Sequence, residues 1–177
     1  MRAGGVEYVI LGALSFGPRS GYEIKRLVDK STRFFWAASY GQIYPELRRL
    51  EQEGLIESES DPQGGRRRIR YSLTPAGRDR LRGWLREPGA GYEVRDEGLL
   101  KLFFARALEP DEVHEVVRAL RVERERVLEQ LRAIERMGVA RESGALVLEY
   151  GISSHEWMID WCRDAEERLR RREEVAR

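Results

Sequence analysis

Residues 39–74 constrain the fold more than any other part of this 177-residue chain. The segment begins with SYGQIYPELRRLEQEGLI, where Ile43, Leu47 and Leu50 follow at intervals of four and three residues. That spacing predicts a short helix with one apolar face. Gly54 comes just after the periodic run and supplies a residue that tolerates the left-handed conformation at a helix end. We therefore expect a helix that packs one side inward and leaves the other open.

An arginine-rich ribbon is predicted directly after this helix. An acidic segment and the turn sequence DPQGG precede RRRIRYSLT, in which Ile69, Tyr71 and Leu73 alternate with polar residues. Gly64-Gly65 allows the positive φ values of a tight hairpin turn. Arg66 to Arg68 then fall at the exposed tip, where planar guanidinium groups suit phosphate or a narrow minor groove.

In DNA-binding proteins, a helix followed by a basic ribbon can enter a major groove and contact the adjacent backbone. The hydroxyl, amide and guanidinium groups of the two elements are candidates to contact base edges and phosphates. These candidate DNA-binding residues are Ser39, Tyr40, Gln42, Tyr44, Arg48, Arg49, Arg66, Arg67 and Arg68. The alternative is that they form ordinary solvated surface; their succession in one segment favours DNA binding. Pro45 implies that the helix starts near Gly41 or that its first turns are distorted.

The flanking segments complete a winged helix-turn-helix over residues 1–87. A first helix is predicted from the apolar residues Val6, Val9, Ile10, Ala13 and Leu14. Ser20 caps a second helix, from Gly21 to about Lys30, which buries Ile24, Leu27 and Val28. Thr74-Pro75 opens a fourth helix, in which Leu81, Trp84 and Leu85 are expected to face inward.

This half of the chain resembles the PadR-type transcriptional regulators. The resemblance is carried by Ile10-Leu11-Gly12 with Leu14, Ser20-Gly21-Tyr22-Glu23-Ile24, Ile43-Tyr44-Pro45 with Leu47, Arg49-Leu50-Glu51, Gly54-Leu55-Ile56, Gly65-Arg66, Tyr71, Leu73-Thr74 and Gly77. Ile69-Arg70 departs from the pattern, since many relatives carry other basic or aromatic residues before the tyrosine. The resemblance implies a dimeric bacterial repressor, often controlled by a small molecule, that binds double-stranded DNA at an inverted-repeat operator near its target promoter.

Composition agrees with a nucleic-acid partner and gives no support to catalysis. Residues 1–87 hold 16 basic and 11 acidic residues, whereas residues 88–177 hold 16 and 20. The basic excess therefore lies in the proposed DNA-binding half. Two histidines and one cysteine give no plausible zinc set or nucleophile triad, and no glycine-rich phosphate loop is present. We expect no catalytic residues, no metal and no cofactor.

Cysteine content and hydrophobic runs indicate the cellular compartment in which the chain folds. Cys162 is the only cysteine, so no disulfide can form within the chain and a reducing cytoplasm is expected. Its position beside Trp161 favours packing over a redox role. No apolar run approaches the roughly 20 residues of a membrane span, and no secretion signal is evident.

A linker over residues 87–91 separates the first domain from a helical domain, residues 92–177. Asp96 is predicted to cap a helix that buries Leu99, Leu100, Phe103, Phe104 and Ala107. A long helix follows from Pro110 and ends at Gly138, with a coiled-coil-like seam, broken only at Arg124, of Val113, Val117, Leu120, Val127, Leu131 and Ile134. The last helix, from about 142 to 172, presents Leu146, Tyr150, Trp157, Trp161, Ala165 and Leu169.

Two or three helices with long apolar seams do not fill a compact core alone, so we expect a homodimer. A two-fold axis would place two recognition helices in successive major grooves, about 34 Å apart, on a pseudo-palindromic operator. The alternative is a monomer whose helices form an intramolecular bundle.

The aromatic residues of the second domain suggest an effector site. Tyr150, His155, Trp157 and Trp161 are speculative candidates to hold a small aromatic molecule. An aromatic stripe at helical spacing more often belongs to the core, and this is the preferred interpretation. We expect a mostly α fold with a small β-ribbon, an N-terminal winged helix-turn-helix and an all-helical dimerisation domain. The predicted function is that of a sequence-specific transcriptional regulator, a dimeric repressor released by an effector. The alternative is a winged-helix protein-interaction or adaptor module.

Overall fold

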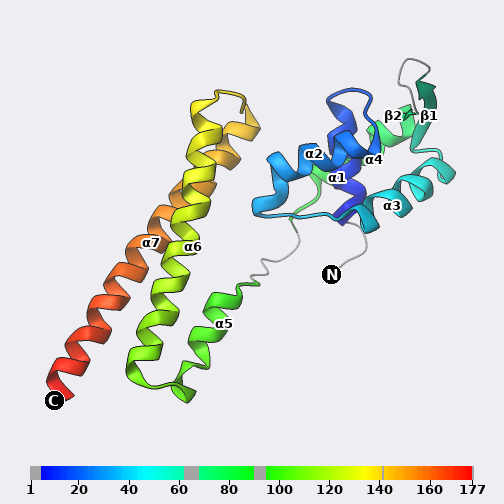
Figure 1. The fold of residues 1–177 in the computed structure, drawn as a ribbon. Helices are drawn as coiled ribbons and strands as arrows, with labels where there is room; N and C mark the ends of the chain where they lie inside the picture. The colour runs from blue at the N-terminus through cyan, green and yellow to red at the C-terminus, as the bar shows by residue number, and fades with distance from the viewer. Residues whose placement is uncertain (1–4, 62–67, 90–94, 141, 177) are drawn as a thin grey trace. The chain divides into compact units, whose positions relative to one another are not determined.

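The computed structural model describes residues 5–61, 68–89, 95–140 and 142–176. The chain forms two compact units, Met1–Gly91 and Tyr92–Arg177. Figure 1 shows helices in both units and a single ribbon of strands in the first. Over the described ranges, no helix has both the length and the apolar character needed to cross a bilayer.

The first unit has the predicted order of helix, helix, helix, ribbon and helix. Its elements are α1 (Gly5–Ser15), α2 (Gly21–Lys30), the 3-10 turn η1 (Thr32–Phe34), α3 (Tyr40–Gln52), β1 (Ile56–Asp61), β2 (Arg68–Leu73) and α4 (Pro75–Arg86). The strands are antiparallel, with Ile56 opposite Leu73 and Asp61 opposite Arg68. The mostly α fold with a small β-ribbon is therefore confirmed.

The core of this unit draws on every helix and on both strands. Fully buried side chains include Ile10 and Leu11 of α1, Ile24 of α2, and Ile43 of α3. Ile56, Tyr71, Leu73 and Leu81 close the same cluster from the ribbon and from α4. Burying a side chain of this size stabilises a fold by about 1.5–3 kcal/mol, so the helices of this unit are held chiefly by their shared interior.

Local capping fixes where the helices begin. The Ser20 hydroxyl accepts a hydrogen bond from the Glu23 backbone N–H, and the Glu23 carboxylate accepts one from the Ser20 N–H, which completes a capping box. Thr74 caps α4 by accepting from the Gly77 N–H at 3.1 Å. Both caps were predicted from the sequence and are confirmed.

The inward orientation predicted for the end of α4 is wrong in part. Leu81 is buried as expected, but Trp84 is 41% exposed and Leu85 is 65% exposed. Trp84 stacks on Tyr8 of α1, with ring centroids 4.3 Å apart. The buried residues of α4 are Gly77 and Leu81, one turn apart on the side that meets α1 and β2, and Trp84 and Leu85 lie beside this side at the surface.

The second unit is helical over its described residues. It consists of α5 (Glu97–Phe103), the 3-10 turn η2 (Ala105–Ala107), α6 (Pro110–Arg136) and α7 (Ser143–Ala176). The side chain of Asp96 caps α5, as predicted, by accepting from the Leu99 N–H at 3.1 Å. Gly138 has a φ of 60° just after α6, which is the left-handed conformation expected at a helix end. Figure 1 shows α6 and α7 side by side, with α5 along the first part of α6.

Arg124, which interrupts the apolar seam of α6, forms an ion pair with Asp96 at the start of α5. The neighbouring seam residues Val117 and Leu120 are buried together with Cys162 of α7, and Leu131 is buried farther along α6. The break in the apolar pattern therefore marks the place where α6 holds the cap of α5.

The apolar faces predicted for α5 and α7 are only partly buried. Leu146, Tyr150 and Trp157 are 67%, 66% and 64% exposed, and α7 instead turns Ile152, Ile159 and Cys162 inward. Trp161, Ala165 and Leu169 are half-buried against the core. In the α5 region, Leu100, Phe103, Phe104 and Ala107 are exposed. The reason for the error on α7 is that this helix carries two apolar stripes, and periodicity does not tell which one faces a neighbour in the same chain.

Candidate nucleic-acid interface

The recognition helix α3 is anchored by three residues on one face and is open on the other. Ile43, Leu47 and Leu50 have no exposed surface. The helix begins at Tyr40, within one residue of the expected start, and Pro45 lies inside it. Because Pro45 sits near the first turns and is exposed, the hydrogen bond it cannot donate is lost on the solvent side.

Tyr40, Tyr44 and Arg48 follow one another by a helical turn along the exposed side of α3. The two tyrosine rings stack with centroids 6.1 Å apart. Lys25 of α2 places its Nζ atom 5.5 Å from the centre of the Tyr40 ring. The structure thus brings three of the predicted residues together and adds a lysine that sequence reasoning missed.

A close approach between α2 and α3 sets the position of Tyr44. A Cβ atom at Gly21 would lie 2.7 Å from the Tyr44 ring and 3.2 Å from the Leu47 side chain. Only glycine leaves room for this contact. The start of α2 therefore rests directly on the first half of α3.

Ser39 and Gln42 cap the start of α3. Ser39 is the N-cap residue, and the Gln42 side-chain oxygen accepts from the Ser39 backbone N–H at 3.0 Å and from its hydroxyl at 3.1 Å. This pairing fixes the rotamer of Gln42 and leaves its amide NH2 as the group that could meet a base edge.

Arg49 lies in a cluster of carboxylates on the flank of α3. Its Nη2 atom donates to Glu7 of α1 at 2.7 Å and to Glu46 at 2.7 Å, its Nε donates to Glu46 at 3.1 Å, and its Nη1 pairs with Glu53. The hydrogen bonds that Arg49 donates to Glu46 raise the pKa of this guanidinium above its ordinary value. Arg49 is thus separated from the line of Tyr40, Tyr44 and Arg48.

Glu7 also contacts the last helix of the unit. Its second carboxylate oxygen accepts from Arg80 Nε of α4 at 2.9 Å, and this bond raises the pKa of Arg80. The Glu7 residue is only 4% exposed. Sequence reasoning missed it, although a carboxylate within the otherwise apolar run GVEYVILGAL was a visible signal.

The ribbon is joined to the helices by its second strand. The backbone of Tyr71 exchanges two hydrogen bonds with Arg19, at 3.0 and 2.8 Å, and Arg70 donates to the Pro18 carbonyl at 2.7 Å. Burial raises the pKa of Tyr71, and Tyr44 and Arg48 lie near enough to modify it. The ribbon also contacts α3 directly, through β1. Arg66, Arg67 and the side chain of Arg68 lie outside the described residues.

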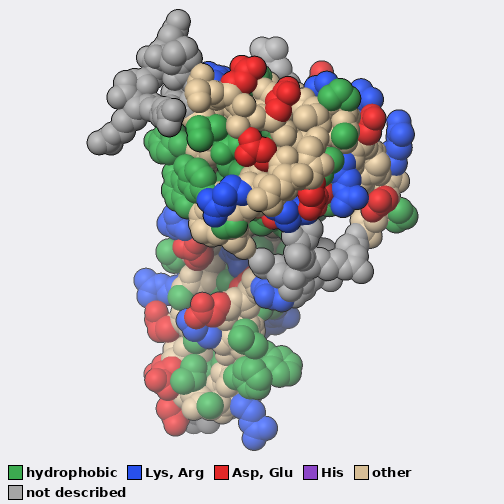
Figure 2. Space-filling model, turned by 90° about the vertical axis from the view of Figure 1, so that its right-hand side faces the viewer, with side chains coloured by type: hydrophobic (Ala, Val, Ile, Leu, Met, Phe, Trp, Pro, Cys, Tyr) green, Lys and Arg blue, Asp and Glu red, His purple; other side chains and the backbone are tan. Residues whose placement is uncertain are grey.

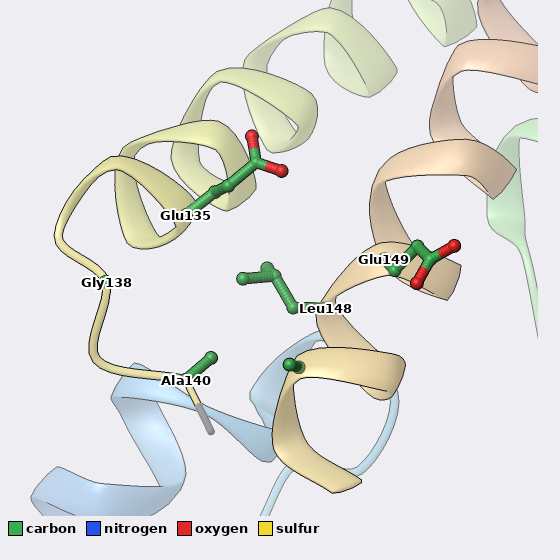
Figure 3. Close-up of a pocket in the computed structure, with 6 residues that line it drawn as sticks. Glu135, Gly138, Ala140, Leu148 and Glu149 are labelled. Atoms are coloured by element: carbon green, nitrogen blue, oxygen red, sulfur yellow. The ribbon is translucent and has the colours of Figure 1, made fainter. Parts of the chain in front are cut away.

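The four effector candidates all lie on α7 and differ in exposure. Tyr150 and Trp157 are exposed, His155 is half-buried with its Nδ1 atom 2.8 Å from the Gly151 carbonyl oxygen, and Trp161 packs on the core. A separate hollow at the turn between α6 and α7 is lined by Glu135, Gly138, Ala140, Ala145, Leu148 and Glu149, as Figure 3 shows. It contains none of the four. Across the residues that the structure describes, no group of three or more histidine, cysteine or acidic residues could hold a metal.

Two family models match the sequence of this chain. Residues 10–83 match the transcriptional regulator PadR-like family, and residues 94–170 match the virulence activator alpha C-terminal model. A probable transcriptional regulator of Mycobacterium tuberculosis is 33% identical over 182 residues, which cover 92% of this chain and 96% of the relative. The chain belongs to the PadR-like family of transcriptional regulators.

Solved structures of PadR-like proteins share both units. Bacillus subtilis PadR in complex with operator DNA has a TM-score of 0.82 and 29% identity, over 92% of this chain and 98% of that chain. The same protein in complex with p-coumaric acid has a TM-score of 0.77 and 28% identity, over 93% and 98% of the two chains. In the sequence comparison, the negative transcriptional regulator PadR of Bacillus subtilis is 36% identical over 113 residues, which span 63% of this chain and 62% of the relative.

Proposed function

We propose that this PadR-like protein is a dimeric repressor that binds a pseudo-palindromic operator through α3 and the ribbon. One observation carries the proposal. The exposed line of Tyr40, Tyr44 and Arg48 lies opposite a fully buried face of α3, and an arginine-rich ribbon follows this helix and packs on it. A helix that is held from behind and offers hydroxyl and guanidinium groups in front has the form required for a major groove.

Each contact has a different task in this proposal. Arg48 and the amide NH2 of Gln42 read base edges, while the hydroxyls of Tyr40 and Tyr44 bind phosphate oxygens; the Ser39 hydroxyl donates to Gln42 and so holds that side chain in place. Arg66 to Arg68, which the sequence predicts at the turn between the strands, hold the flanking backbone or minor groove. Arg49 is left out of this contacting set, because three carboxylates surround its guanidinium.

Dimer formation supplies the second half-site. The exposed apolar residues of α7, with Tyr150 and Trp157 among them, give a second copy a surface to cover. Figure 2 shows apolar side chains at the surface among charged ones. Two recognition helices related by a two-fold axis meet grooves about 34 Å apart. The protein acts in the cytoplasm, where bacterial DNA lies, and we assign it no catalytic activity.

A small aromatic effector releases the repressor in this account. The support is the p-coumaric acid complex of Bacillus subtilis PadR, a protein of the same fold. Tyr150 and Trp157 remain candidates for the aromatic contact, which places the effector within the proposed dimer interface. Such a ligand needs to favour the DNA-free arrangement by about 1–3 kcal/mol to act as an inducer.

The experiment separates base reading from backbone binding. A duplex is first selected by the wild-type protein from random-sequence DNA. Gln42→Ala should cost about 1–3 kcal/mol at one base-pair position of this duplex and relax the preference there. Arg67→Ala should weaken binding to all sequences alike and lower the slope of log K against log salt by about one. Arg118→Ala, on the exposed surface of α6, is the matched control and should change neither.

Two results would count against the proposal. If the two variants gave the same sequence-blind loss, the division between helix and ribbon would be wrong. If the wild-type protein enriched no sequence at all, the adaptor alternative would gain support.

The effector is tested with p-coumaric acid as the probe. Tryptophan fluorescence of the wild-type protein should change on titration, and the Trp157→Phe variant should shift the midpoint. DNA release at the same ligand concentration is the expected functional result. A titration that changes fluorescence without releasing DNA would remove the inducer role of this compound class.

A further inference from the structure

We propose that Glu7 is a positioning residue for α3, and that Arg49 sets sequence preference by holding Glu7 instead of touching DNA. The inference rests on the proposed function and assigns a role to charged residues that the DNA-contacting set leaves unused. It concerns three helices at once, because Glu7 lies on α1, Arg49 on α3 and Arg80 on α4.

The burial of Glu7 is the first argument. Its side chain is 5% exposed, and its buried neighbours on α1 are Ile10, Leu11, Ala13 and Leu14. A carboxylate removed from water is costly unless it is paired and hydrogen-bonded. Both of its oxygens are satisfied, one by Arg49 at 2.7 Å and the other by Arg80 at 2.9 Å. Breaking either bond leaves a buried charge without its compensation.

The state of Arg49 is the second argument. A guanidinium has five N–H groups, and Arg49 makes four N–H contacts, which go to the three acids Glu7, Glu46 and Glu53. With Arg80 included, this cluster holds three carboxylates and two guanidinium groups, so its net charge is negative. A negative cluster repels phosphate, whereas Arg48, one residue earlier, lies on the exposed line of α3.

The geometry explains why this cluster affects base reading. The first half of α3 is held where Tyr44 rests on Gly21, and the second half is held where Arg49 meets Glu7. Two such supports, at different places along one helix, fix its rotation about its own axis. Base contacts depend on that rotation much more than phosphate contacts do, since hydrogen bonds to base edges are directional.

The test compares lysine and glutamine at two adjacent positions. Lysine keeps the positive charge but lacks the planar fork that reaches several carboxylates at once. We therefore expect Arg49→Lys and Arg49→Gln to behave alike: each weakens binding to the selected duplex by about 10- to 100-fold and leaves the salt slope on an unrelated duplex unchanged. Arg48→Lys and Arg48→Gln are the matched controls, and there the lysine variant should retain more affinity.

Glu7→Gln should weaken binding to the selected duplex in the same way as the Arg49 variants. It keeps the side-chain volume and removes the charge that Arg49 and Arg80 share. The double variant with Arg49→Gln should lose no more than either single variant, as expected for residues that act as a unit. Arg80→Gln, at a side chain that is 55% exposed, gives the same test should Glu7→Gln not fold. Thermal melting checks the fold of every variant.

Amide hydrogen exchange gives a readout that does not need DNA. Exchange over residues 46–52 should become faster in Glu7→Gln and in Arg49→Lys, because the second half of α3 loses its support. A wild-type protein without sequence preference would refute the proposed function, and exchange would still decide the role of Glu7. The inference is overturned if exchange is unchanged in folded variants, or if Arg49→Gln lowers the salt slope by about one and Arg49→Lys restores it.

Discussion

The two units of this protein bury their apolar residues in different ways. In the first unit, four helices and a ribbon close around one core, and Ile10, Ile24 and Leu47 have no exposed surface. In the second unit, the buried cluster of Val117, Leu120 and Cys162 is small, while large apolar side chains stay exposed. Among these are Leu100, Phe103, Phe104, Leu146, Tyr150 and Trp157.

This difference indicates a division of labour. The first unit completes its own interior and can therefore offer polar and charged side chains to a partner. The second unit leaves large apolar side chains uncovered, and in the proposed dimer a second copy of the chain covers them. Exposed large apolar side chains of this kind are typical of an interaction site. The comparison makes predictions that differ for the two units.

The largest expected effect is a loss of stability in the first unit. Leu47→Ala removes a fully buried side chain of α3 and should lower the free energy of unfolding by about 2–5 kcal/mol. Urea denaturation followed by circular dichroism, at one protein concentration, measures it. Leu85→Ala, on the neighbouring and exposed part of α4, is the control and should change little. Equal losses for the two would contradict the core described here.

The next effect concerns association and belongs to the second unit. Trp157→Ala should raise the dissociation constant of the dimer by about 30-fold or more, as expected for an aromatic residue near the centre of an interface. Sedimentation velocity over a concentration series measures this constant. Trp84→Ala removes an aromatic side chain from the first unit and should leave the constant unchanged. A wild-type protein that is monomeric at micromolar concentration would refute the dimer.

The smallest effect separates two roles of Asp96 at the start of α5. Asp96→Asn keeps an N-cap side chain and loses the charge that faces Arg124, whereas Asp96→Ala loses both. The alanine variant should be less stable than the asparagine variant by about 0.5–2 kcal/mol, the usual contribution of a cap. Thermal unfolding at fixed protein concentration compares them. Identical melting curves would mean that the cap contributes nothing.

Much of the fold was predictable because its signals are local. Ser20, Thr74 and Asp96 cap helix starts through hydrogen bonds of their own side chains, and Gly138 ends a helix in the left-handed conformation. The order of the first unit and its ribbon followed from periods of about 3.6 and 2 residues.

The prediction of which side of a helix is buried was wrong where that side is set by contacts with residues far away in the sequence. Periodicity showed that α7 is amphipathic, but Ile152 and Ile159 face α6 while Tyr150 and Trp157 do not. The candidate DNA contacts stay a prediction, and they were drawn from one stretch of sequence. The pairing of Arg49 with Glu7, 42 residues away, was invisible there. The surface on which two copies would meet is not visible in the sequence of one chain. It shows only in the structure, as apolar side chains that remain exposed.

The central claim is that α3 and the ribbon bind duplex DNA as one surface, twice per dimer. Hydroxyl-radical footprinting on the selected duplex, at low salt, tests it most directly. The account predicts two protected patches whose centres lie about one helical turn apart, on one face of the DNA. A folded, intact protein that protects no nucleotide under these conditions would contradict it.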